Sequence, residues 1–258
     1  MDKYTAKVIR PGAAEADKED RQVAIEAPVS VEFNGIGYAV MMATPSDLED
    51  FVTGFAISEK LAERADQLGA IDVHRHEKGW IIRANVASEK ADAVFERART
   101  RIAESSCGLC GLENLELVAQ PLPEVSAHQP VDKEHIFNAL AALHDHQPLN
   151  KATGGVHAAA WVDETGAIVC VREDVGRHNA LDKLIGAMAR DNRSLSTGFV
   201  LTTSRCSYEI VEKSVIAGAT TLVTISVPTS IAIERARSCG LTLISLARDD
   251  SYLDYSGG

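Results

Sequence analysis

The second half of the chain alternates short apolar segments with segments of helical periodicity. The apolar segments are rich in β-branched residues, which is typical of parallel strands with helices packed on both faces of their sheet. An antiparallel hairpin precedes them. In chain order, the expected elements are a helix at 132–145, a hairpin of 156–162 with 168–171, a helix at 179–190, a strand at 199–203, a helix at 208–217, a strand at 221–225, a helix at 230–237 and a strand at 241–246.

The first half mixes antiparallel strands with helices, an α+β pattern. Two apolar segments, at 28–33 and 38–42, flank the dipeptide Asn34-Gly35. This dipeptide supplies the positive φ values of a tight hairpin turn. The other elements expected here are a helix capped by Ser46 or Asp47 with an apolar face of Leu48, Phe51, Val52, Phe55 and Ile57, strands at 71–73 and 80–84, and a helix at 88–102.

These patterns divide the chain into four parts. Residues 1–22 are polar and irregular, and we expect a flexible arm. Residues 23–118 form a smaller N-terminal α+β domain that ends in a cysteine-containing loop. Residues 119–131 hold three prolines and no apolar periodicity, so we interpret them as a linker. Residues 132–258 form an α/β domain, whose functional groups we expect at the carboxyl ends of its strands.

Composition and charge narrow the function classes. The formal net charge of −11 argues against a general nucleic-acid binder, which needs a basic surface. No apolar segment approaches the roughly 18 residues of a membrane helix, and the N-terminus lacks the apolar core of a signal peptide. The five cysteines show no disulfide-like spacing. We therefore expect a cytoplasmic protein that binds neither nucleic acid nor membrane.

One pair of cysteines looks arranged for chemistry. Cys107 and Cys110 are separated by two residues and followed by glycines, so that both sulfur atoms can converge on one point. Three interpretations are open: a zinc site, although no second ligand pair has the usual spacing; a thioredoxin-like redox site; or a mobile sulfur carrier. Nearby cations lower a thiol pKa toward the reactive thiolate, and the preceding segment carries Arg97, Arg99 and Arg101.

Polar residues gather where strands end and helices begin. His157 opens a strand after two glycines, and Ser204 and Arg205 follow another strand. The block 172–183 lies at a helix start, where backbone amides favour an anion. These features also have purely structural interpretations: the polar residues cap the helices that follow, and His157 is a hydrogen-bonded histidine of the core. No Walker A or G-x-G-x-x-G pattern is present. The candidate contacts to a purine-like ring or a catalytic partner in this block are Asp174, His178, Asn179 and Asp182.

Five motifs taken together resemble one family. The set resembles the FdhD family, the accessory sulfurtransferases required for active formate dehydrogenase, over nearly the whole chain after the first 20 or so residues. The matching stretches are Cys107-Gly108-Leu109-Cys110-Gly111, Gly155–Trp161, Glu173–His178, Ser204–Glu209, and Asn34-Gly35 with Val40–Ala43, extended by Leu241–Leu243.

The resemblance implies a sulfur-transfer mechanism. Family members receive sulfur from a cysteine desulfurase as a persulfide on the CxxC motif. They pass it to the molybdenum cofactor, bis-molybdopterin guanine dinucleotide, before that cofactor enters formate dehydrogenase. By position, Cys107 is then the persulfide carrier and Cys110 assists transfer or release. The family also implies a homodimer, and a guanine nucleotide can mimic the cofactor.

The resemblance also implies a binding site for the cofactor. In the family, the residues that contact the cofactor follow the last strand. The matching segment of this chain contains the acidic residues Asp249 and Asp250, where glycine or basic residues are expected. A groove with local positive charge is expected beside it, edged by Arg172, Arg177, His178, Lys183, Ser204 and Arg205. The matching segment consists of Leu246, Ala247, Arg248, Asp249, Asp250 and Ser251.

The family's C-terminal domain resembles the three-layer cytidine-deaminase fold, and the expected order of elements is compatible with it. Zinc deaminases need a His-x-Glu motif and a later Pro-Cys-x-x-Cys. The sequence contains no His-x-Glu, and its CxxC precedes the domain. We therefore expect neither zinc nor deaminase chemistry. Two other functions stay open: a non-catalytic nucleotide-binding chaperone and a thiol-disulfide oxidoreductase.

Overall fold

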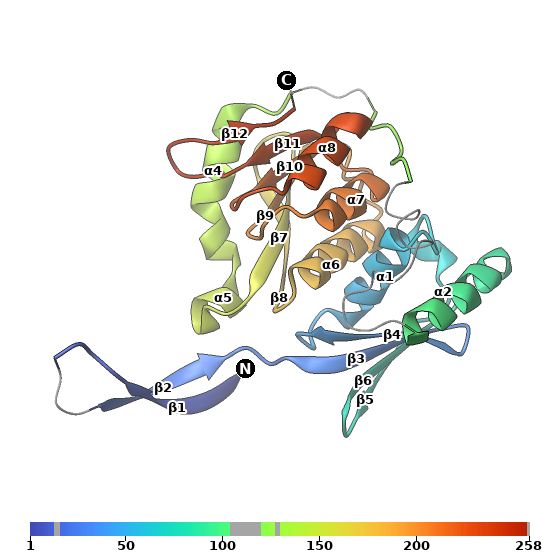
Figure 1. The fold of residues 1–258 in the computed structure, drawn as a ribbon, viewed down its shortest axis with the longest axis horizontal. Coiled ribbons are helices and arrows are strands. Elements are labelled where there is room, and N and C mark those ends of the chain that lie inside the picture. The colour runs from blue at the N-terminus through green and yellow to red at the C-terminus, as the bar shows by residue number, and fades with distance from the viewer. Residues whose placement is uncertain (13–15, 104–119, 127–129, 257–258) are drawn as a thin grey trace.

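The computed structural model describes residues 1–12, 16–103, 120–126 and 130–256. Three sheets are present in this part of the chain: a six-stranded sheet, a four-stranded sheet and a two-stranded ribbon. Figure 1 shows the six-stranded sheet between two helical layers, and the four-stranded sheet beyond one of these layers. The fold is therefore mixed α/β, as the sequence predicts.

The six-stranded sheet has the order β12-β11-β10-β9-β7-β8. Its three central strands are parallel, and the hairpin β7–β8 joins them in antiparallel orientation. The expected hairpin and the expected parallel strands are both confirmed. The strands are β7 (His157–Val162), β8 (Ile168–Asp174), β9 (Phe199–Thr202), β10 (Thr221–Thr224), β11 (Thr242–Ser245) and β12 (Leu253–Asp254).

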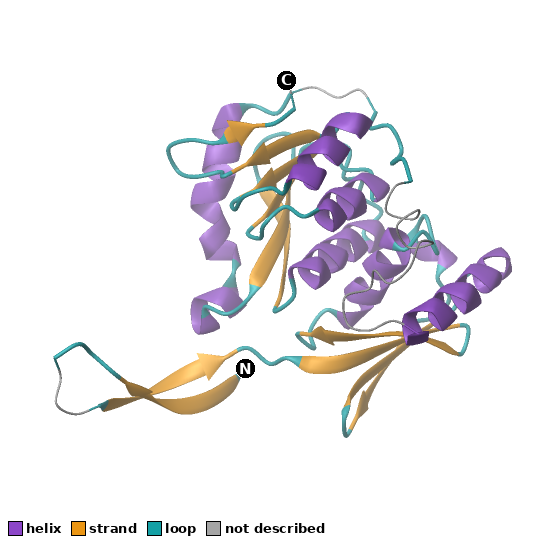
Figure 2. Ribbon diagram, in the orientation of Figure 1, coloured by secondary structure: helices purple, strands orange, loops and turns teal. Residues whose placement is uncertain are grey.

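Helices cover both faces of this sheet because its side chains alternate between two cores. On β7, Ala159 and Trp161 belong to one core, and Ala160 and Val162 belong to the other. Figure 2 shows the helices on either side of the strands. None of the helices in the described ranges is long and apolar enough to span a bilayer. The first core lies under α6 (Arg177–Arg190), α7 (Tyr208–Ile216) and α8 (Ser230–Cys239), and the second under α4 (Lys133–Leu143), which is followed by η3 (His144–His146) and α5 (Pro148–Thr153).

The four-stranded sheet has the order β4-β3-β6-β5, with β3 and β6 parallel. Asn34 and Gly35 have φ values of 52° and 77°, so the predicted turn between β3 and β4 is confirmed. Three rings, those of Phe33, Tyr38 and Phe55, pack at centroid distances of 5.4 to 6.5 Å. The elements are β3 (Ala27–Phe33), β4 (Ile36–Ala43), α1 (Leu48–Ser58), η1 (Ala65–Gln67), β5 (Asp72–His76), β6 (Gly79–Ala84), η2 (Ser88–Lys90) and α2 (Ala91–Ala103).

Helix α1 is buried on all sides, so the expectation of a single apolar face is wrong. Every residue of α1 except Glu49 is buried, because α1 lies between the four-stranded sheet and α6 (Figure 1). Glycines let the two helices meet backbone to backbone. A Cβ atom at Gly54 would lie 1.8 Å from the Asp182 carbonyl oxygen, and one at Gly186 would lie 1.8 Å from that of Asp50. This crossing joins the two halves of the molecule.

The helix start differs from the expected cap. Asp47 occupies the N-cap position of α1, but its backbone is left-handed, with φ 50°, and its side chain makes no capping hydrogen bond. Its carboxylate instead lies 3.9 Å from the guanidinium of Arg172. The prediction that Asp47 stands at the helix start is therefore confirmed. Its carboxylate, however, faces the distant cation Arg172 and does not bond to a backbone amide of the helix.

The N-terminal residues form a ribbon, so the expectation of an irregular arm over 1–22 is wrong. Strands β1 (Asp2–Val8) and β2 (Asp17–Val23) pair in antiparallel orientation, and Figure 1 shows them extending away from the rest of the molecule. Cross-strand polar contacts support the pairing, including Lys3 with Asp20 at 2.9 Å. Because nearly all of these side chains are exposed, the ribbon leaves no alternation of apolar and polar residues in the sequence.

The segment interpreted as a linker is packed against the second half where it is described. Leu122 belongs to the core beneath α6, α7 and α8. The Val125 amide donates to the carbonyl of Cys239 at 2.8 Å, and Arg235 donates to the carbonyl of Gln120 at 3.1 Å. Residues 120–126 are therefore fixed along α8, since an extended proline-containing segment can bury one side chain and bond its backbone without regular periodicity.

Candidate functional site

The carboxyl ends of the parallel strands form one continuous polar edge. The turns after β9, β10 and β11 bond to each other: Ile225 donates to the Thr202 carbonyl at 3.0 Å, and Leu246 donates to that of Ser226 at 3.2 Å. His157 reaches the same edge because β7 is antiparallel to β9, and it pairs in register with Asp174 at the end of β8. The topology therefore brings together strand ends that are distant in sequence.

A group of four titratable side chains lies where α6 and α7 begin. His178 Nε2 on α6 is 2.9 Å from Glu209 Oε2 on α7, and the neighbouring His178 holds the pKa of Glu209 below its usual range. Burial lowers the pKa of His157, and the positive charges of Arg177 and His178 lower it further. These side chains form the polar centre of the edge.

Two of the predicted site residues lie beside this group in different environments. Ser204 is buried, and its hydroxyl donates to the Arg205 carbonyl at 3.0 Å. Arg205 is exposed. The hydroxyl of Ser204 thus shapes the turn after β9, while the guanidinium of Arg205 projects charge from that turn.

Asp174 and Asn179 attach the edge to the other half of the molecule. Both are buried. The carboxylate of Asp174 accepts from the amides of Thr44 and Gly176 at 3.0 and 2.8 Å, and Asn179 Nδ2 donates to the carbonyl of Met42 at 2.8 Å. Their polar groups are therefore engaged by protein partners at the junction with β4, rather than facing the open edge.

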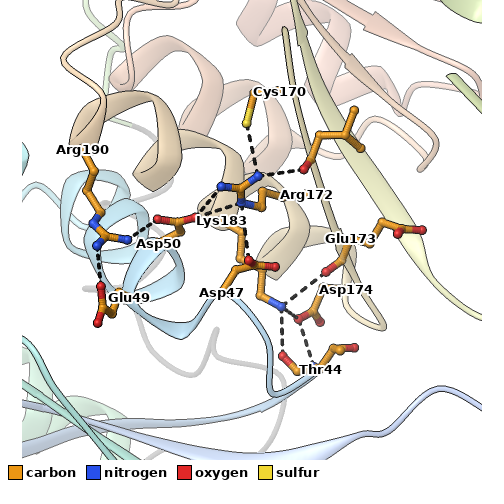
Figure 3. Close-up of polar contacts among 11 residues, drawn as sticks. Thr44, Asp47, Glu49, Asp50, Cys170, Arg172, Glu173, Asp174, Lys183 and Arg190 are labelled. Atoms are coloured by element: carbon orange, nitrogen blue, oxygen red, sulfur yellow. Dashed lines mark hydrogen bonds and ion pairs between the residues drawn. The ribbon is translucent and has the colours of Figure 1, made fainter. Parts of the chain in front are cut away.

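Arg172 and Lys183 belong to the same junction, so the expectation that they line an open groove is wrong. Figure 3 shows Arg172 directed toward Asp50 on α1, at 2.8 Å, and Lys183 directed toward Asp174 and Thr44. The side chain of Lys183 is completely buried. Each cation is used to neutralise a carboxylate that the contact between the halves has removed from water.

Asp182, another predicted contact, is likewise occupied inside the molecule. Ser58 on α1 donates to its carboxylate at 2.7 Å, and Lys213 on α7 does so at 2.8 Å. Burial raises the pKa of Asp182. Its partners therefore lie on the helices that pack around α6, away from the strand ends.

The segment from Leu246 to Ser251 lies at the same edge after β11. Leu246 has a φ of 52°, a left-handed conformation that strains a bulky residue and that is often found at functional positions. The guanidinium of Arg248 donates to the carbonyls of Ile225 and Ala247. Asp249 and Asp250 are exposed, as is Ser251, whose hydroxyl donates to Asp250 at 3.0 Å.

The candidate sulfur carriers Cys107 and Cys110 lie outside the described residues. The preceding helix α2 is fixed to the C-terminus of α1 by Arg97, which donates to the carbonyl of Glu59. The described cysteines are Cys170, Cys206 and Cys239. Burial raises the pKa of Cys206 to about 12, so this thiol does not form a thiolate near neutral pH.

A comparison with protein families decides the identity of the chain. The model of the FdhD/NarQ family matches residues 24–258. The chain belongs to the FdhD/NarQ family. This confirms the family inferred from the five motifs, and the match begins directly after the N-terminal ribbon and just before β3.

Individual relatives of this FdhD/NarQ protein agree. It is 46% identical over 245 residues to the sulfur carrier protein FdhD of Xanthomonas euvesicatoria pv. vesicatoria, covering 95% of this chain and 87% of the relative. It is 44% identical over 253 residues to the sulfur carrier protein FdhD of Burkholderia mallei, covering 95% of this chain and 92% of the relative.

A solved structure has the same fold. A crystal structure of a formate dehydrogenase accessory protein from Desulfotalea psychrophila superposes with a TM-score of 0.76 at 23% sequence identity, covering 99% of this chain and 96% of that one. The arrangement of sheets and helices described above is therefore that of a known architecture.

Sequence reasoning missed two residues of the edge. Ser207 and Glu209 belong to the matching stretch Ser204–Glu209, but neither is among the predicted site residues, although Ser207 is the N-cap residue of α7 and Glu209 lies in its first turn. Only their position in the sequence could have indicated them, because they follow β9, a strand that ends at the polar edge. What the sequence did not show is that α6 and α7 begin side by side.

Proposed function

We propose that this FdhD/NarQ protein is a sulfurtransferase of the persulfide-carrier type. It accepts sulfur from a cysteine desulfurase on Cys107 and transfers it to bis-molybdopterin guanine dinucleotide, which formate dehydrogenase needs for activity. One observation carries the proposal: the family match over 24–258 includes Cys107 and Cys110 and relates the chain to proteins named sulfur carriers.

The two cysteines divide the transfer into balanced steps. The Cys107 thiolate attacks the terminal sulfur of the donor persulfide, so that one S–S bond breaks as another forms and the donor leaves as a thiolate. The Cys110 thiolate then attacks Cys107 Sγ, which releases hydrosulfide and leaves a Cys107–Cys110 disulfide. The two thiols supply the two electrons that reduce the transferred sulfur. In this scheme the released hydrosulfide is the species that is passed on to the cofactor.

The cofactor is a substrate that we place at the carboxyl edge. It is large, anionic and guanine-bearing, and the edge offers unpaired polar groups at the starts of α6 and α7. The left-handed turn at Leu246 brings backbone of the last loop to the same edge. Outside the last loop, the predicted contacts with exposed or half-buried side chains are His157, His178 and Arg205.

Several finer expectations belong to this proposal. The second half, 132–258, is proposed to share the cytidine-deaminase fold, which is supported by its observed order of helix, hairpin, helix and alternating strands and helices. We also propose the division into domains at 23–118 and 132–258, a homodimer, and a place in the cytoplasm with the desulfurase and formate dehydrogenase as partners.

The alternative is a chaperone that binds the cofactor without carrying sulfur. It is favoured by the polar edge, because the described edge is built without Cys107 or Cys110. The two functions differ in one requirement: only the sulfurtransferase needs a thiol at Cys107.

The intact mass of the protein tests the proposal. Wild type, Cys107→Ala and the control Cys170→Ala are incubated with a cysteine desulfurase and free cysteine without reductant. We expect wild type and the Cys170 variant to gain one sulfur atom, reversed by thiol reductant, and Cys107→Ala to gain none. An equal gain in Cys107→Ala would overturn the role of Cys107 and favour the chaperone.

A further inference from the structure

Arg97 on α2 fixes that helix to the carboxyl end of α1. Its guanidinium donates to the backbone carbonyl of Glu59 and lies 3.7 Å from the Glu59 carboxylate. Glu59 is the C-cap residue of α1, and the end of a helix favours a cation because its last carbonyls carry the negative end of the helix dipole. The two side chains are partly buried, with exposed fractions of 38% and 20%. The contact is therefore partly shielded from water and lies where a cation is favoured.

The carboxylate of Glu59 is also held from the four-stranded sheet. The hydroxyl of Tyr38 on β4 donates to Glu59 Oε2 at 2.9 Å. Tyr38 is buried, and its ring packs against Phe33 and Phe55 at centroid distances of 5.4 and 5.8 Å. The phenol cannot turn away without opening this aromatic cluster. Glu59 therefore offers Arg97 a rigid anchor.

Helix α2 is the described element that leads into the cysteine motif. In Figure 1 it lies over β4 beside α1. Val94 and Ala98 are buried, and they share a helix face with Arg97 because residues three and four apart are neighbours on a helix. The last residue of α2, Ala103, precedes Cys107 by four residues in the sequence. The anchored face of α2 therefore fixes the helix shortly before the motif begins.

We propose that Arg97 is a positioning residue for the loading of sulfur onto Cys107. By fixing α2 to Glu59, it sets the place and direction in which the chain enters the cysteine motif. This rests on the proposed function, since it assigns Arg97 a part in the transfer from a protein persulfide. It differs from a role as a cation that lowers a thiol pKa, because the guanidinium is directed to Glu59, whose carboxylate offsets its charge.

The two roles differ in how they depend on the sulfur donor. Loading needs a Cys107 thiolate that attacks the terminal sulfur of a persulfide, while the donor leaves as a thiolate. A small donor can reach that thiolate by diffusion in many orientations. The persulfide of a desulfurase reaches it only when the two proteins dock in one geometry. Loss of the anchor therefore slows loading from a protein donor and leaves loading from a small donor unchanged.

Loading of the full chain from two donors tests this role. Wild type and its variants receive sulfur from a small amount of cysteine desulfurase with free cysteine, or from glutathione persulfide, and the gain of one sulfur atom is followed by intact mass, with Cys107→Ala as the background. We expect Arg97→Gln to lower the second-order rate of loading from the desulfurase by about tenfold, because a charged hydrogen bond holds the anchored state. Arg97→Lys keeps a charged donor and loses less.

The matched control is Arg83→Gln. Arg83 pairs with Glu32 at 2.9 Å and with Asp72 at 3.4 Å on the exposed face of the same sheet, so we expect its loss to change either rate by less than about twofold. With glutathione persulfide, we expect Arg97→Gln to keep both the rate and the pH midpoint of wild type, since the thiol itself is unchanged.

Three outcomes would overturn the positioning role. An unchanged desulfurase rate in Arg97→Gln would show that the anchor is not needed, and equal losses with both donors or a raised pH midpoint would show that Arg97 acts on the thiol. Thermal unfolding checks the fold of each variant. If Arg97→Gln unfolds, Tyr38→Phe loosens the same anchor and carries the comparison. Wild type that gains no sulfur from either donor would instead refute the proposed function, and this inference with it.

Discussion

The ammonium of Lys183 lies 2.6 Å from the carboxylate of Asp174, and neither side chain has any exposed surface. The pair sits where α6 and β8 meet the end of β4, and Lys183 also donates to the carbonyl of Thr44 at 2.9 Å. Figure 3 shows these groups converging from the two halves of the molecule. The pair therefore fixes the sheet edge to a segment about half the chain away in sequence.

Replacing Lys183 tests this attachment. Lys183→Met leaves the Asp174 carboxylate buried without its cation, so we expect the free energy of unfolding to fall by about 3–5 kcal/mol, measured by urea denaturation. Adding Asp174→Asn removes the uncompensated charge and recovers part of the loss. The control is Lys151→Met, which breaks an exposed pair with Asp145 and costs about 0.5 kcal/mol. Equal losses in both single variants would contradict the assignment.

The crossing of α1 and α6 depends on Gly186. An added Cβ would lie 1.8 Å from the Asp50 carbonyl oxygen, so Gly186→Ala must push the helices apart. We expect a loss of about 3 kcal/mol in the free energy of unfolding, as in an overpacked core. In an ordinary helix, replacing glycine by alanine would raise the free energy of unfolding by about 1 kcal/mol. A loss of stability in Gly186→Ala therefore supports the close approach of the two helices, and a gain contradicts it. Gly37→Ala, which has no atom within 4 Å of the added Cβ, is the control.

Protonation of His157 should oppose folding. Burial and the charges of Arg177 and His178 lower its pKa in the folded state, so the unfolded chain takes up the proton first as the pH falls. The stability is complete above the ordinary histidine pKa and is lost as the pH falls through the lowered value. We expect the Tm of wild type to fall more between pH 7.5 and 5 than that of His157→Gln. Parallel pH profiles would show that the imidazole titrates normally.

Much of the fold was determined by local sequence pattern. The turn at Asn34-Gly35, the hairpin of β7 and β8, and the alternation of strands and helices from β9 to β11 follow from turn chemistry and from the spacing of apolar residues. The sequence also located the polar edge, because residues that follow parallel strands must meet at one end of the sheet. It predicted the sulfur chemistry from the Cys107–Cys110 spacing and from resemblance.

Tertiary structure alone decided which polar residues face the edge. Arg172, Asp174 and Lys183 stand in the same sequence block as Arg177 and His178, but the first three are engaged at the contact with α1 and β4. The backbone partner of Asp174 lies at Thr44, 130 residues away. The spacing of residues within a block indicates only which side of a helix or strand each residue occupies. The ion-pair and hydrogen-bond partners of that residue lie on distant segments, which pack against it only in the folded protein.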